Sequence, residues 1–243
     1  MSRAISIFYQ SIKLSLSSKY LYIAPISGIA VTLFLSIAAY RYPGDLAVSP
    51  AKYAIGKGIE LANFFGCLLS VFVASGSSQS VYELELTKPI PRWKYFLFQT
   101  LGEIVFPLGT VVSIMLGIQL YLFSKGEPFY KEIIIVIVLI TIAIVAIIGF
   151  IKVLSLILDD LPALAFGLTV VLFSTQAFRG ALARLYFPWD VLLYMLPDLQ
   201  TPQLIASLYL HGMDIEWKYL LGPVAYAIIS FLVAIVIFER KDL

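Results

Sequence analysis

The chain has 243 residues, of which 60% are hydrophobic and 13% charged, and its mean hydropathy of +0.94 excludes an ordinary water-soluble globular protein. The formal net charge of +2 gives no reason to expect a nucleic-acid partner. Cys67 is the only cysteine, which excludes an internal disulfide and a cysteine metal cluster, and we expect it to be a small buried residue. No linker-like stretch divides the sequence, so we expect one all-α membrane domain over residues 1–243.

The first segment, residues 1–19, has the pattern of an amphipathic helix. It is not a signal peptide, because the apolar run begins only near Leu21 and no small-residue cleavage site follows it. Apolar side chains recur at helical spacing opposite polar ones, which predicts an interfacial helix lying in the headgroup plane of a membrane. The apolar positions are Ile5, Phe8, Ile12 and Leu16, and the polar positions are Ser6, Gln10, Lys13 and Ser17.

Two apolar runs follow, residues 21–40 and 61–81, and each is long enough to cross a bilayer core of about 30 Å as a helix. Residues 41–58, between them, are polar and rich in proline and glycine, which predicts a loop. Small residues at a spacing of four allow two helices to approach closely in lipid, either within one bundle or between subunits. The second run has this spacing at Gly66, Ser70 and Ala74.

A polar interruption, residues 82–94, separates the second apolar run from the third. Charges at its density cannot lie in hydrocarbon, so the segment must leave the membrane. Leu84 and Leu86 alternate with acidic residues, which gives the segment one apolar side and one charged side. Pro89 and Pro91 then end any helix, because proline lacks the amide donor. The charged residues are Glu83, Glu85, Lys88, Arg92 and Lys94.

Three further apolar runs, residues 97–123, 133–151 and 161–178, are predicted as spans three to five. The first of them repeats the small-residue spacing at Gly109, Ser113 and Gly117. Glu103 is its one charge, and we expect a solvated carboxylate near the start of the helix and not a residue of a transport pathway. Asp160 precedes a proline at the start of span five and has a sufficient explanation as a helix cap.

Residues 181–212 are apolar but interrupted by prolines, so two short helices that dip into the membrane fit better than one spanning helix. His211 is the only histidine, and we expect it to be a loop residue and not a ligand. Residues 219–238 form the sixth span, and a charged tail closes the chain. Six spans place both termini on one side of the membrane.

Three motifs in this order resemble type-2 ABC exporter permeases, the ABC-2 family. Residues 83–92 are similar to the coupling helix after that family's second span, with an acidic residue, a Leu-rich turn and a Pro-Ile-x-Arg tail, although Pro91 stands where Ser or Thr is commoner. Pro188-Trp189 and Leu210-His211-Gly212 resemble the outer segment before the last span. Residues 238–243 resemble the family's basic ending.

The resemblance implies a permease subunit without an ATPase site of its own. The sequence has no phosphate-binding loop of the G-x-x-x-x-G-K-[ST] type, so ATP and Mg²⁺ would be bound by a separate ATPase subunit. Further implied partners are a second permease copy or paralogue and membrane lipids, in the cell membrane of a prokaryote with both termini cytoplasmic. We expect no catalytic, cofactor or metal residue. The residues expected to dock on the ATPase are Glu83, Leu84, Glu85, Leu86, Lys88, Pro89 and Arg92.

Two other classes of function stay open at the level of sequence. A membrane scaffold or assembly factor needs only the docking segment, and an intramembrane enzyme would depend on the few polar groups at depth, Glu103, Lys152 and Asp160. Charge bias does not settle orientation, because cytoplasmic termini place nine of the 17 basic residues inside and eight outside. The transported substrate is also left open.

Overall fold

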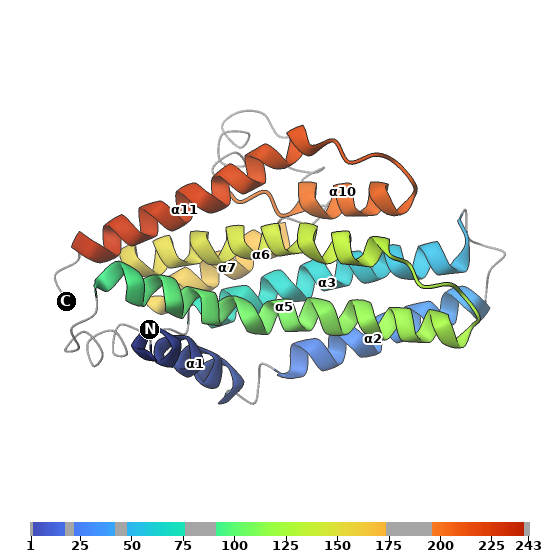
Figure 1. The fold of residues 1–243 in the computed structure, drawn as a ribbon, viewed down its shortest axis with the longest axis horizontal. Coiled ribbons are helices and arrows are strands. Elements are labelled where there is room, and N and C mark those ends of the chain that lie inside the picture. Colours follow the sequence, from blue (N-terminus) through green and yellow to red (C-terminus); the bar gives the residue numbers. More distant parts are fainter. Residues whose placement is uncertain (1, 18–21, 42–47, 76–90, 174–195, 241–243) are drawn as a thin grey trace.

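The computed structural model describes residues 2–17, 22–41, 48–75, 91–173 and 196–240, and these ranges contain helices and turns but no strand (Figure 1). The expected all-α fold is therefore confirmed for the described part of the chain. The elements are α1 (Ser2–Ser17), α2 (Ile23–Arg41), α3 (Pro50–Ser75), α5 (Arg92–Ser124), α6 (Glu132–Ile157), α7 (Asp160–Phe173), α10 (Gln200–Leu210), the 3₁₀ turn η3 (Trp217–Leu220) and α11 (Leu221–Arg240).

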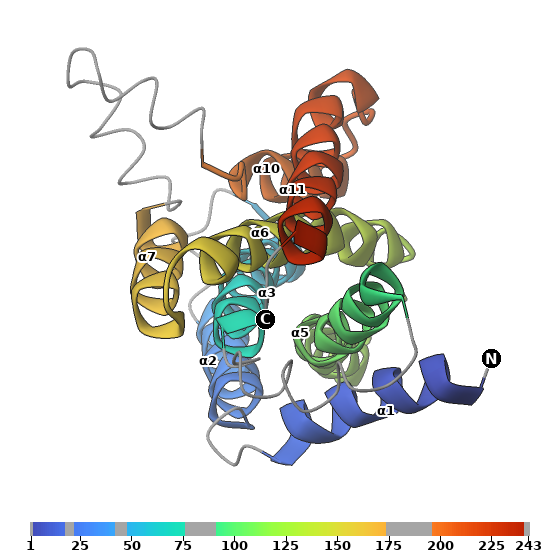
Figure 2. The same cartoon turned by 90° about the vertical axis from the view of Figure 1, so that its left-hand side faces the viewer.

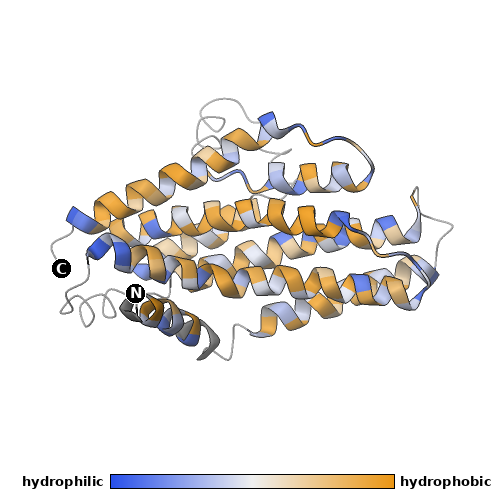
Figure 3. Cartoon of the chain, in the orientation of Figure 1, coloured by the Kyte–Doolittle hydropathy of each residue, from blue (hydrophilic) through white to orange (hydrophobic). Residues whose placement is uncertain are grey.

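Among the described residues, four helical segments are long and apolar enough to cross a membrane: α3, α5, α6 and η3 with α11. The helices α2 and α7 are apolar but shorter. Colouring by hydropathy shows a broad apolar band along the bundle, with polar residues concentrated at its two ends (Figure 3). Large apolar side chains such as Leu120, Phe123 and Leu161 are exposed on the outside of this band, as suits a surface in contact with lipid.

The core of the bundle is centred on α3, which packs against α2, α5, α6 and α7. Glycine permits the closest of these contacts. A Cβ atom at Gly66 would lie 2.9 Å from Val111 of α5 and 3.1 Å from Ile144 of α6. A Cβ atom at Gly58 would collide with Ile118 of α5. The helices α3, α5 and α6 therefore share one closely packed seam.

Two further helices pack on the outside of this seam, α11 mainly on α6 and α1 on α5. α11 crosses α6 at Gly149, where an added Cβ atom would meet Ser230 and Phe231. α1 extends across the bundle and not along it, at the end where α5 begins and α11 finishes (Figure 2). A helix over most of the predicted segment 1–19 is confirmed, with Ile7 buried against the protein and Ile5 and Tyr9 exposed. Its position in the headgroup plane of a membrane stays a prediction.

The predicted loop at residues 41–58 is wrong over its second half, because α3 begins at Pro50. Ser49 is the reason. Its side-chain Oγ lies 3.4 Å from the amide of Lys52 and its carbonyl accepts from the amide of Tyr53 at 3.0 Å, so Ser49 caps a helix whose first residue is proline. The glycines taken as loop signals include Gly58, which is a packing residue inside the helix.

Other boundaries differ by fewer residues. α5 begins at Arg92 and not at residue 97, so Arg92 and Lys94 of the predicted coupling segment 82–94 form its first turn, directly after Pro91. α6 continues to Ile157 and not to residue 151. α2 and α11 lie within three residues of the predicted 21–40 and 219–238. The first part of the predicted outer segment, residues 181–195, and the end of the predicted span 161–178 lie outside the described residues.

Candidate functional site

The predicted coupling segment is described only at its end. Glu83, Leu84, Glu85, Leu86, Lys88 and Pro89 lie outside the described residues, whereas Arg92 opens α5. The Arg92 guanidinium donates to the carbonyl of Glu239 at 3.4 Å, which joins the start of α5 to the end of α11. Trp93 and Lys94 are exposed beside it, with the Lys94 Nζ atom 5.3 Å from the centre of the Trp93 ring.

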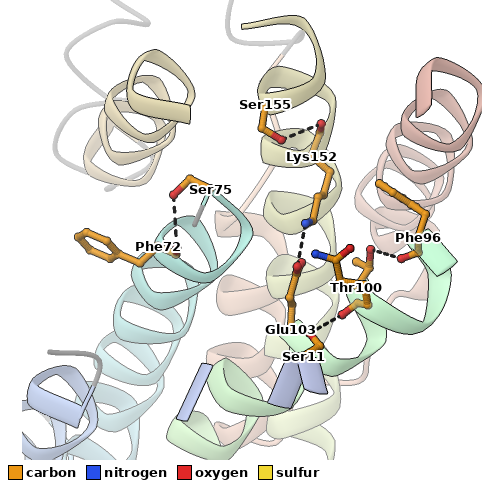
Figure 4. A network of polar contacts seen from close by, with 9 residues as sticks. Ser11, Phe72, Ser75, Phe96, Thr100, Glu103, Lys152 and Ser155 are labelled. Carbon is orange, nitrogen blue, oxygen red and sulfur yellow. Dashed lines mark hydrogen bonds and ion pairs between the residues drawn. The ribbon is translucent and has the colours of Figure 1, made fainter. Parts of the chain in front are cut away.

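An ion pair is buried between α5 and α6 near this end of the bundle (Figure 4). The Lys152 Nζ atom lies 2.8 Å from Glu103 Oε1, and the two side chains are only 1% and 4% exposed. The expectation of a solvated Glu103 is therefore wrong. A carboxylate inside an apolar bundle needs a charged partner, and Lys152, which lies 49 residues further along the chain, supplies it.

The same part of α5 receives α1. Ser11 Oγ of α1 donates to the backbone carbonyl of Gln99 at 2.9 Å, and both residues are buried. A Cβ atom at Gly102 would lie 2.6 Å from the Cβ atom of Ser11 and 2.9 Å from the carbonyl oxygen of Phe8. α1 therefore touches one side of α5 at the level where Glu103 pairs with α6 on another.

Aromatic and aliphatic side chains also join the helices at this end of the bundle. Phe96 of α5 and Phe238 of α11 are fully buried, with ring centres 5.3 Å apart. The cluster draws on four helices, α1, α5, α6 and α11, and is separate from the main core. We call it the end cluster, and its buried members are Ile7, Tyr95, Phe96, Leu156, Ala234 and Phe238. Together with the ion pair it binds four helices into one unit beside the predicted coupling segment.

A second polar group, which sequence reasoning missed, lies between α3 and α10. Asn63 is 5% exposed, and its Nδ2 atom donates to the carbonyl of Leu199 at 3.0 Å and to Gln203 Oε1 at 2.9 Å. Asp198 accepts from the backbone amides of Gln200 and Thr201, each at 3.1 Å. Asp198 indicates this helix start in the sequence, because an acidic residue just before an apolar helical stretch is a typical N-terminal cap.

The predicted packing residues fall into two different environments. Gly66, Ser70 and Ala74 are buried within the chain, so the contact they make is between helices of one bundle. Gly109 and Ser113 are exposed on α5, and an added Cβ atom at Gly109 would meet nothing within 4 Å. Gly117 is half-buried near Ile29 of α2. The small-residue face of α5 is thus left uncovered by the described part of this chain.

At the opposite end of the bundle, a carboxylate joins α2 to the turn between α5 and α6. Tyr40 donates to Glu127 Oε1 at 3.1 Å and Tyr130 to Glu127 Oε2 at 3.2 Å. Gln119 bonds the same turn through the carbonyl of Pro128 and the amide of Tyr130, each at 3.3 Å. Burial raises the pKa of Tyr130, and the charge of Glu127 raises this pKa further.

Three further residues were candidates in the sequence. His211 is exposed at the end of α10, where its Nδ1 atom lies 2.7 Å from the carbonyl oxygen of Ser207. Cys67 is buried, with Sγ 3.7 Å from Asn63 Oδ1. Asp160 begins α7. Within the described ranges, no group of three or more His, Cys, Asp or Glu side chains is placed to hold a metal ion.

No family model matches the chain, and no curated protein matches its sequence.

Proposed function

We propose that the chain is the permease subunit of an ATP-driven exporter of the ABC-2 type, which forms its substrate pathway as a dimer and is driven by a separate ATPase subunit. One observation carries the proposal. The last residues of the predicted coupling segment, Arg92 to Lys94, form the first turn of α5, and within its first turns this helix is joined to α1, α6 and α11. A force applied to the segment before Arg92 would therefore move four helices together.

The chemistry of these joints suits such a role. The Glu103–Lys152 pair is short and almost completely buried, so it resists separation of α5 from α6, because the separated charges would lie unpaired in an apolar interior. Gly102 brings α1 close to α5, and close packing transmits displacement with little loss. ATP binding by the partner would move the coupling segment. These contacts would convert that movement into a joint shift of α1, α5, α6 and α11.

In this proposal the bundle has six spans. Four spans are the long apolar helices, and α2 and α7 are the other two. α10 belongs to an outer segment that enters the membrane without crossing it. The end of the bundle that holds α1, the start of α5 and the end of α11 faces the cytoplasm (Figure 1). The opposite end, with the loops at residues 125–131 and 211–216, faces outward.

The proposed partner permease would pack on the uncovered face of α5. Gly109 and Ser113 are small residues, so they add little bulk to this face. A second helix can approach such a face closely in lipid, where packing and not the hydrophobic effect drives association. The buried face at Gly66, Ser70 and Ala74 is already used within the chain and is not available for this contact.

The test is purification of the tagged chain from native membranes in mild detergent, followed by mass spectrometry of the proteins that remain bound. We expect a P-loop ATPase with the wild type and its loss from the double variant Glu83→Lys, Glu85→Lys. The matched control is Asp214→Lys, Glu216→Lys, which makes the same change in charge at exposed positions on the opposite end of the bundle. This control should retain the ATPase.

Three results would contradict the proposal or part of it. If no ATPase accompanied the wild type, the permease function would be wrong, and a membrane scaffold would become the better reading. If the ATPase remained bound to both double variants, residues 83 and 85 would not form the docking surface. An ATPase that binds but whose turnover never responds to any exported compound would also favour a scaffold.

A further inference from the structure

The start of α10 lies against the middle of α3. Asn63, which contacts it, is 13 residues after Pro50 and 12 residues before Ser75, the two ends of α3. Leu199, the residue before α10, is fully buried. A helix that begins at this depth exposes backbone groups to an apolar interior, because the first amides of a helix have no partners within it.

Side chains bond the backbone on both sides of this start. Asp198 accepts from the amides of Gln200 and Thr201, and its second oxygen accepts from the Thr201 hydroxyl at 2.5 Å. Asn63 donates to the Leu199 carbonyl and to the side chain of Gln203, one turn into α10. Asp198 belongs to the α10 segment itself, whereas Asn63 donates to this start from another helix, α3.

We propose that Asn63 is the positioning residue through which α3 holds the start of α10. Its amide group contacts α10 at two points, one before the first turn and one within it, which fixes both the depth and the rotation of the short helix. The Cys67 thiol, one turn along α3, approaches the oxygen of the same amide and favours the orientation in which its nitrogen faces α10.

If the proposed function is correct, the contact between Asn63 and α10 has a role in transport. This part of the inference rests on the proposed function. α3 ends at Ser75, at the end of the bundle where the predicted coupling segment leaves, and Asn63 lies about 18 Å from that end at the helical rise of 1.5 Å per residue. One rigid helix therefore joins the proposed ATPase-docking end to α10. Movement of the docking end would shift α10 and open or close the outer half of the pathway.

The test is amide hydrogen exchange of the full chain in lipid nanodiscs, read by mass spectrometry. We expect Asn63→Leu, which removes the donor at similar volume, to increase the exchange rate of the α10 amides about tenfold, because the start of α10 loses both of its hydrogen bonds from Asn63. Exchange in α6 and α11 should not change. Asn63→Asp should give at least as large an increase, because an ionised carboxylate cannot donate to the Leu199 carbonyl and would be buried without a charged partner.

Glu60→Gln is the matched control, since Glu60 lies on α3 one turn away, is exposed and pairs only with Lys57 among the described contacts. It should leave α10 unchanged. Gln203→Leu is a milder second variant, which removes one of the two contacts from the partly exposed side and should also speed exchange in α10. Unchanged α10 exchange in both Asn63→Leu and Gln203→Leu would overturn the inference, as would equal acceleration throughout the bundle.

Nucleotide provides a readout that a purely structural role of Asn63 would not affect. In the complex with the ATPase, trapped ATP should change the exchange of α10 in the wild type and leave it unchanged in Asn63→Leu. An equal response of both proteins would show that α10 is not driven through Asn63. Failure of the ATPase to bind the wild type would count against the proposed function, whereas the exchange rates without nucleotide would still decide whether Asn63 holds α10.

Discussion

Lys152 of α6 and Glu103 of α5 form a 2.8 Å ion pair whose side chains are almost inaccessible to solvent. Two charges in an apolar bundle are expensive to bury, and their mutual attraction only partly offsets this cost. The arrangement therefore makes separation of α5 and α6 costly while contributing little net stability compared with well-packed apolar residues. Removal of one partner and replacement of both should therefore change the free energy of unfolding by different amounts.

We expect Lys152→Leu to reduce the free energy of unfolding by about 3–5 kcal/mol, because Glu103 is then left buried without its cation. The double variant Glu103→Leu, Lys152→Leu should recover most of that loss, since no unpaired charge remains. Unfolding in mixed micelles at increasing denaturing detergent measures both. If the single and double variants were equally destabilised, the two residues would act independently and the pair would not hold α5 to α6.

The second prediction compares two glycines on α5. Gly102→Ala should reduce the free energy of unfolding by about 1–3 kcal/mol, because the new methyl group would collide with Ser11 and with the Phe8 backbone carbonyl, which cannot turn aside. Gly109→Ala adds the same methyl group seven residues along the same helix, where no described atom of the same chain lies within 4 Å. Because Gly109 lies on the face proposed for the second copy, stability is compared on single chains separated in detergent, in which the higher helix propensity of alanine should be neutral or stabilising by up to about 1 kcal/mol.

Accessibility of α1 gives the readout that is specific to this contact. A cysteine at Ile7, in a background in which Cys67 is replaced by alanine, should be protected from a water-soluble thiol reagent while α1 is docked. Gly102→Ala should increase its labelling, and Gly109→Ala should not. Equal labelling in the two backgrounds would mean that α1 does not depend on the close approach at Gly102.

The third prediction concerns the second copy that the proposed function requires. In the background without Cys67, a single cysteine at Ser113 should form a disulfide between two chains on oxidation in the membrane, because Ser113 is exposed on the uncovered face of α5. A single cysteine at Ser70 should not, because Ser70 is buried between helices of the same chain. Crosslinking at neither position would place the subunit interface on another face.

Amino-acid composition and run length were enough to predict that the described part of the chain is helical, with helices long and apolar enough to cross a membrane, because an apolar backbone segment in lipid has few alternatives to a helix. Helix starts were predicted less well. Proline and glycine between residues 41 and 58 indicated a loop, yet Ser49 and Pro50 form a helix start and Gly58 allows α3 to approach α5. The same residue types serve turns, caps and close packing, and local sequence does not distinguish these uses.

The candidate site was harder to predict, because its contacts join residues far apart in the chain. Glu103 lies near the start of an apolar run, which predicts a solvated carboxylate, and nothing local indicates that Lys152 would neutralise it. Gly66 and Gly109 occur in the same small-residue pattern, but one is buried and the other exposed. Which face of a helix meets the rest of the chain depends on tertiary packing, which the spacing alone does not contain.

The last prediction concerns pH and the turn between α5 and α6. Burial of the Tyr130 hydroxyl and its hydrogen bond to Glu127 raise the pKa of Tyr130 in the folded state, with a further contribution from the charge of Glu132. The folded chain therefore holds this proton more tightly than the unfolded chain. The stability linked to it is fully present below the ordinary tyrosine pKa of about 10 and is lost as the pH rises through the higher folded-state value.

We therefore expect the free energy of unfolding of the wild type to fall with pH above about 10 more steeply than that of Tyr130→Phe. The variant should be less stable than the wild type at neutral pH, because the hydrogen bond to Glu127 is lost, and the difference should shrink as the pH rises. Phe129→Leu, at an exposed position in the same turn, should keep the wild-type slope. Parallel pH profiles for wild type and Tyr130→Phe would mean that the Tyr130 proton is not linked to folding, and the bond between this turn and Glu127 would then lie outside the cooperative unit that unfolds.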